Sequence, residues 1–155
     1  MTSKTQLQTK IQELEAELAS FKSQLNNYKV PTLQEANVGD TLEDGSIVLS
    51  KENGIALLIA PKSTEVKSTW SQDFPEVYAK LQEQGFNPSQ WFVPTKEQLK
   101  LAYERLKNEF DSAGYWSSKE VNATFAYFVY FNNGGAGSDL KAGVRCVRAF
   151  RCVTY

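Results

Sequence analysis

The side chains that could do chemistry lie mainly between Gly114 and Arg148, and none of them is a histidine. The whole sequence contains no histidine, which removes the commonest general base and the commonest metal ligand. Serine and cysteine nucleophiles that depend on a histidine base are excluded with it. We therefore expect no enzymatic activity, no metal site and no cofactor.

A glycine-rich stretch from Asn132 to Ser138 carries the best candidates for ligand binding. Glycine and small polar residues favour turns over a strand ladder, so we expect a surface loop here. No Gly-Lys-Ser/Thr follows, which argues against a phosphate loop, and Asp139 is the loop's only carboxylate, which is too few for calcium. Amide, hydroxyl and charged groups beside an aromatic face suit a sugar or protein surface. The candidate ligand-binding residues are Asn132, Asn133, Ser138, Asp139, Lys141 and Trp116. For the aromatic side chain, packing in the core is the alternative.

Basic residues gather at the end of the same region. Lys141, Arg145, Arg148 and Arg151 form the one basic concentration of the chain. An arginine fork matches carboxylate and sulfate oxygens, so the cluster could hold an acidic or sulfated glycan. The alternative is that Arg145 and Arg148 are partly buried and paired with acids such as Asp111 or Glu120.

The only two cysteines are Cys146 and Cys152. On a straight strand, six residues at about 3.3 Å each separate them by roughly 20 Å, beyond the about 4.4 to 6.8 Å that a disulfide tolerates between Cα atoms. We expect free thiols, consistent with a reducing compartment. A bridge is the alternative if the chain turns between residues 149 and 151.

The elements that must position these residues read as an α+β domain. The wholly apolar run 125–131 predicts a central strand covered on both faces, from which the chain returns through residues 142–150. A hairpin is predicted over 38–42 and 46–50, and an apolar strand over 54–60. Helices are predicted over 73–84 and from Thr95, where Thr95 and Gln98 form a capping box.

The first thirty residues carry a different pattern. Apolar residues step by three and four without a break, which is the heptad seam of a coiled coil. Lys10 would face Glu15 of a neighbouring helix, and Glu17 would face Lys22, only if the helices run parallel and in register. We predict a stalk over residues 1–30 that joins copies of the chain and a domain over residues 31–155. The oligomerisation residues are Leu7, Ile11, Leu14, Leu18, Phe21, Leu25 and Tyr28.

The aromatic seam residues Phe21 and Tyr28 are bulky for a dimer, so we favour a parallel homotrimer and keep a dimer as the alternative. A single amphipathic helix packed on its own domain is the other interpretation. It is less favoured because such helices usually carry a wider apolar stripe.

Four segments in order resemble the landmarks of a bacterial and phage domain family. They are Trp91–Leu99 (WFVPTKEQL), Tyr115–Ser118 (YWSS), Ala126–Phe131 with glycines following, and Val144–Arg148 (VRCVR). The family is DUF1566, typified by the C-terminal domain of the Legionella collagen-like adhesin. The resemblance covers about residues 38–150. It implies a C-type-lectin-like fold, in which the termini lie close together and the late strands carry the binding loops, and it implies a role in adhesion.

Composition narrows the setting. Lysine plus arginine number 17 against 18 acidic residues, so a generally basic nucleic-acid binder is not indicated. We see no membrane-spanning segment and no signal peptide. An oligomeric display protein without an export signal suggests a virion component, such as a phage fibre, spike or capsid decoration. It would be assembled in host cytoplasm, attached to other virion proteins through residues 1–6, and would bind a host-surface glycan or protein. The alternatives are a virion cement protein and an intracellular bacterial protein-binding module.

Overall fold

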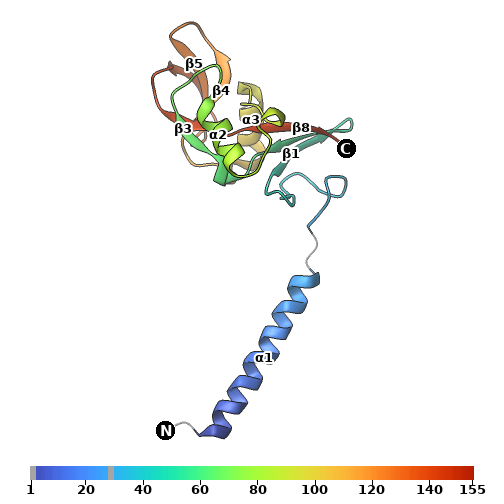
Figure 1. The fold of residues 1–155 in the computed structure, drawn as a ribbon. Coiled ribbons are helices and arrows are strands. Elements are labelled where there is room, and N and C mark those ends of the chain that lie inside the picture. Colours follow the sequence, from blue (N-terminus) through green and yellow to red (C-terminus); the bar gives the residue numbers. More distant parts are fainter. Residues whose placement is uncertain (1–2, 28–29) are drawn as a thin grey trace. The chain divides into compact units, whose positions relative to one another are not determined.

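The computed structural model describes residues 3–27 and 30–155, which fall into two compact units, Met1–Val30 and Pro31–Tyr155. The first is a single helix, and the second contains two sheets and two further α-helices (Figure 1). The predicted α+β class is confirmed by this mixture of helices and largely antiparallel sheet.

The helix of the first unit, α1, spans Lys4–Asn27. It begins with a reciprocal cap, because the Ser3 amide donates to Gln6 Oε1 at 2.9 Å and the Gln6 amide donates to Ser3 Oγ at 3.2 Å. Residues 4–6 therefore belong to the first turn of this helix. The predicted seam residues are more than half exposed, from 51% at Leu14 to 73% at Leu25. Tyr28 lies outside the described residues.

The strands of the second unit form two sheets. The smaller sheet has the order β1 (Ile47–Glu52), β2 (Ile55–Ile59), β8 (Phe150–Thr154) and is antiparallel. The larger has the order β3 (Val66–Ser68), β7 (Arg145–Val147), β4 (Gly114–Glu120), β5 (Phe125–Tyr130), β6 (Ala136–Leu140). Its pairs are antiparallel except for β4 with β7.

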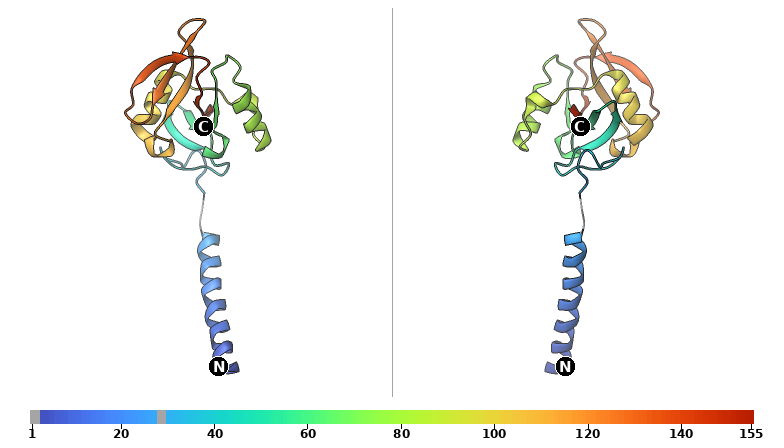
Figure 2. Two further views of the ribbon diagram at one scale, coloured as in Figure 1. Left: turned by 90° about the vertical axis from the view of Figure 1, so that its left-hand side faces the viewer. Right: turned by 90° about the vertical axis from the view of Figure 1, so that its right-hand side faces the viewer.

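Two helices cover the strands from opposite sides (Figure 2). α2 spans Pro75–Glu83, shorter than predicted because Phe74 before it has a left-handed φ of 39°. α3 spans Lys96–Leu106, and its predicted capping box is present. Thr95 Oγ1 accepts from the backbone amide of Gln98, and Gln98 Oε1 accepts from the backbone amide of Thr95. Short 3₁₀ turns occur at Lys62–Thr64, Pro88–Gln90 and Lys107–Glu109.

Strand β5 divides the core into two clusters. Val129 and the following Phe131 pack with Leu99 of α3, whereas Phe128 packs with Val77 of α2 and the indole of Trp116. The prediction that this strand is internal is confirmed, since it pairs with both β4 and β6. Only its middle is covered on both faces, because Phe125 and Tyr130 are 37% and 38% exposed.

Two strand predictions were wrong. Residues 38–42 form no regular strand. Thr41 bridges to Ile47, and the Gly39 and Leu42 amides donate to the oxygens of Val48 and Ser46 across the turn at Gly45. The glycine-rich stretch is a loop only as far as Gly135, because Ala136–Leu140 form β6 and return beside β5. The Phe128 ring lies against Gly137, so close that a Cβ added to the glycine would be 3.2 Å from Cζ of the ring. The ring therefore covers the strand where the glycine has no side chain.

The chain after β6 also differs from prediction. Residues 145–147 pair with β3 and β4, and residues 150–154 join the other sheet, so neither returns along β5. Among the helices of the described residues, none is both long and apolar enough to cross a membrane.

Candidate ligand-binding site

The predicted aromatic contact, Trp116, is a core residue. Its side chain is fully buried in β4, and its indole Nε1 donates to the backbone oxygen of Ser68 at 3.0 Å. It stands next to Phe128 in an edge-on arrangement, with ring centroids 6.3 Å apart. Because no surface of the ring is open, Trp116 cannot contact a ligand in this structure, and the core alternative holds for it.

The other predicted ligand residues do not converge on one point. Asn132 and Asn133 are exposed in the turn after β5, where Asn133 Oδ1 accepts from the Gly135 amide at 2.8 Å. Ser138 is exposed in β6 opposite Tyr127, and Asp139 lies opposite Ala126. Since neighbouring residues on a strand face opposite sides, Ser138 and Asp139 belong to different surfaces.

Asp139 is engaged by an arginine. Arg145 donates to Asp139 Oδ2 from Nη2 at 2.6 Å and from Nε at 3.2 Å, and this contact holds the pKa of the Asp139 carboxyl below its usual range. The guanidinium of Arg145 also lies 3.7 Å from the ring centroid of Phe128. Lys141 is likewise paired, at 2.6 Å from Glu120. For Arg145 the alternative of a partly buried, acid-paired arginine is therefore the correct one, although its partner is Asp139 and not Asp111 or Glu120.

Arg148 is a structural residue. It is 1% exposed, its Nε donates to the Ala60 oxygen at 2.8 Å, and its Nη1 donates to the Glu109 oxygen. Burial lowers the pKa of its guanidinium. Arg151 lies over Trp91, with its guanidinium carbon 5.9 Å from the ring centroid. Arg148, being buried and bonded to backbone oxygens, does not contribute to a surface anion site.

One group of acids and a thiol has ligand-like spacing, namely Glu65, Asp111 and Cys146, whose ligand atoms lie within 4.8 Å of one another. A lysine already fills this position, since Lys62 Nζ lies 2.6 Å from Glu65 and 2.9 Å from Asp111. The hydroxyl of Tyr115 donates to Glu65 at 2.5 Å. The group is thus a polar network in which one lysine joins two carboxylates, and burial raises the pKa of the Cys146 thiol. Cys146 and Cys152 are free, in different sheets.

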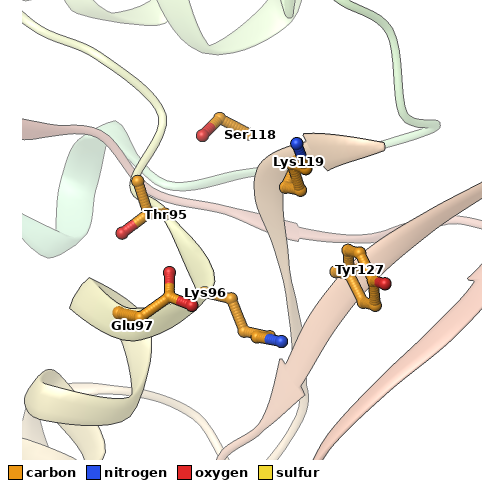
Figure 3. A pocket seen from close by; sticks show the side chains of 6 residues that line it. All are labelled: Thr95, Lys96, Glu97, Ser118, Lys119 and Tyr127. Atoms are coloured by element: carbon orange, nitrogen blue, oxygen red, sulfur yellow. The ribbon is translucent and has the colours of Figure 1, made fainter. Parts of the chain in front are cut away.

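A pocket of about 430 Å³ lies between the start of α3 and the strands β4 and β5 (Figure 3). The sequence did not predict it. It brings together two of the segments noted above, the one containing Pro94-Thr95-Lys96 and the one ending in Ser117-Ser118. The lining residues are Thr95, Lys96, Glu97, Ser118, Lys119 and Tyr127.

A break in strand pairing opens this pocket. Trp116 pairs with Phe128 and Glu120 pairs with Ala126, so three residues of β4 stand opposite the single residue Tyr127. Such a bulge re-aims side chains and interrupts the ladder. Ser118 turns to the loop before α3, where its amide donates to the Pro94 oxygen at 2.9 Å. The signal for this bulge lies in the register of two strands, which local sequence does not encode.

A comparison of the chain with protein-family models and with curated proteins found no match.

Proposed function

We propose that the protein is a non-enzymatic recognition protein in which α1 forms a parallel coiled coil, three chains to a bundle, and displays the unit of residues 31–155. In this proposal the unit has a C-type-lectin-like fold and is related to the DUF1566 adhesin domains. The protein is a phage virion component, a fibre, spike or capsid decoration, that binds a glycan or protein on the host surface.

The exposed seam of α1 is the observation that carries the proposal. Its six described apolar residues repeat at heptad spacing, and each is more than half exposed in the single chain. A helix with such a stripe is stabilised when a second helix covers the stripe. The occupant that fits best is another copy of the same helix, because Lys10 with Glu15 and Glu17 with Lys22 are complementary between parallel copies.

Two features support the domain assignment. The pairing of β2 with β8 brings the early and late parts of residues 31–155 together, as the lectin-like fold requires. The turn at Asn132 and Asn133 is exposed, as a binding loop must be. A recognition site on each of several linked copies gains strength through avidity even where a single contact is weak.

The stalk is tested by light scattering on the full chain. We expect a mass of three times 17.4 kDa, and a monomer for Leu14→Asp/Leu18→Asp, in which charges replace seam residues. The matched control, Ala16→Asp/Ser23→Asp, adds the same charge on the opposite side of α1 and should keep the trimer. A wild-type monomer would refute the stalk.

Recognition is tested on the same sample by binding to whole bacterial cells and to a glycan array. The adhesion proposal expects binding that weakens when Asn132 and Asn133 are replaced by alanine. A trimer that binds no cell and no glycan would favour the cement alternative, and a chain that captures only cytoplasmic proteins would favour an intracellular binding module.

A further inference from the structure

The pocket between α3 and the β4–β5 strands contains two lysines without an acidic partner. Lys96 comes from the first turn of α3 and Lys119 from the bulged part of β4 (Figure 3). Within residues 3–27 and 30–155, neither side chain makes an ion pair. Lys62, Lys80 and Lys141 all do, so the charge of this pocket is available to a ligand.

Tyr127 gives the pocket an aromatic wall. Its ring is half-buried in β5, and Lys96 Nζ lies 4.7 Å from the ring centroid. This cation–π contact keeps the ammonium group at the pocket. Thr95 and Ser118 add hydroxyl groups, and Glu97 adds one carboxylate that can accept hydrogen bonds from ligand hydroxyls.

The pocket is formed before any ligand arrives. The Ser118 amide holds the loop before α3 through the Pro94 oxygen at 2.9 Å, and Ser117 Oγ donates to the Tyr127 oxygen at 2.9 Å. The capping box fixes Thr95 at the start of the helix. A ligand therefore meets walls that are already in place, which lowers the entropic cost of binding.

We propose that this pocket binds a sugar that carries an acidic group, a carboxylate or a sulfate. Lys96 and Lys119 contact the acidic group, the Tyr127 ring packs against the apolar part of the sugar, and Glu97 with the hydroxyls of Thr95 and Ser118 bonds the sugar hydroxyls. The volume suits one or two sugar rings. The inference deepens the proposed recognition of a host surface and rests on it.

The test compares two disaccharides that differ in one group. Cellobiouronic acid carries a carboxylate where cellobiose carries a hydroxymethyl group, and amide chemical shifts of the full chain detect even millimolar binding. We expect the acidic disaccharide to shift the amides of Ser118, Lys119 and Tyr127, and to bind about tenfold more tightly than cellobiose, which corresponds to about 1.4 kcal/mol. A cellobiose sulfate tested in parallel distinguishes the two acidic groups.

Charge-matched variants locate the effect. Lys96→Gln/Lys119→Gln should weaken binding of cellobiouronic acid about tenfold or more. Lys100→Gln/Lys107→Gln removes the same charge from exposed positions outside the pocket and should leave binding within about twofold. Equal binding of the acidic and neutral disaccharides, or full binding by the pocket variant, would overturn the proposal.

Two further outcomes are decisive. Sodium sulfate or acetate that shifts the same amides as strongly as the sugar acids would reduce the pocket to a simple anion site. If whole-cell binding is present but survives Lys96→Gln/Lys119→Gln, the pocket proposal fails and adhesion stands. If the wild-type chain binds no cell, adhesion fails whatever the disaccharides show.

Discussion

Gly134, in the turn between β5 and β6, has a φ of +75°, and a Cβ added there would lie 2.4 Å from Cε1 of Tyr103. Two separate constraints thus require glycine at this position. A left-handed backbone disfavours any side chain, and the tyrosine ring occupies the space that a methyl group would need. The turn that carries Asn132 and Asn133 therefore lies directly against the Tyr103 ring of α3.

We expect Gly134→Ala to cost more than the backbone alone. Gly85 after α2 also has a positive φ, +87°, but nothing lies within 4 Å of its added Cβ, so Gly85→Ala measures the backbone cost, about 1 kcal/mol. Gly134→Ala should lose at least about 1 kcal/mol more because the ring must move. Urea unfolding at equal protein concentration measures both. Equal losses in the two variants would show that the clash is relieved freely.

The Asp139 carboxyl should titrate below its ordinary pKa of 3.8 because Arg145 donates to it. A carboxyl whose pKa is lowered by folding adds stability that is present above the unfolded pKa and is lost as the pH falls through the folded pKa. We expect Arg145→Gln to return the pKa of Asp139 towards its ordinary value in a carboxyl-carbon NMR titration. The carboxyl of Asp111, whose pKa is lowered by Lys62, should stay lowered and serves as the control. An unchanged Asp139 would contradict the pairing.

At the residue scale, the sequence shows which chemical groups are present but does not show which side chains are buried. The absence of histidine could be read directly, but Trp116 and Arg148 could not be placed. Whether a tryptophan on a strand faces the core or a ligand depends on which strands pair beside it. Arg148 can be buried because the backbone oxygens of Ala60 and Glu109 accept hydrogen bonds from its guanidinium. Those partners are distant in the chain, so no local pattern reveals them.

At the scale of elements, α3 depends on its capping box. Thr95→Ala removes the hydroxyl that accepts from the Gln98 amide at 3.1 Å, and we expect a loss of about 1 kcal/mol in the free energy of unfolding. Thr95→Ser keeps the oxygen and should stay close to wild type. Urea unfolding of the three proteins at equal concentration tests this, and a Thr95→Ala protein as stable as the serine variant would contradict it.

Local spacing predicted the helices and the apolar strands β2 and β5, but it did not predict β6 or the bulge in β4, which depend on strand pairing. The steps of three and four over residues 7–25, and Thr95 three before Gln98, predicted α1 and the start of α3. The glycine-rich sequence up to Ser138 predicts a loop, whereas the structure forms β6 there because its partner β5 supplies both the hydrogen-bonding ladder and the Phe128 ring that covers Gly137. The bulge in β4, and with it the pocket, depends on the same long-range register.

For the whole molecule, we expect residues 31–155 to fold without α1. The buried clusters that form the core draw on residues from Ala36 onward, and none includes a residue of α1. The shortened chain should be a monomer by light scattering and should unfold cooperatively, with dispersed amide signals that match those of the same residues in the full chain. A shortened chain that is unfolded would show that the division into two units does not hold in solution.

The pairing of β2 with β8 also means that the smaller sheet cannot be completed until the end of the domain has been synthesised. Residues 55–59 leave the ribosome long before residues 150–154, so β2 has only β1 beside it while the rest of the domain is made. Phe150, fully buried in the finished protein, arrives with the last strand. Until residues 150–154 pair with it, this edge of β2 carries unpaired backbone N–H and C=O groups, on which a neighbouring nascent chain can pair.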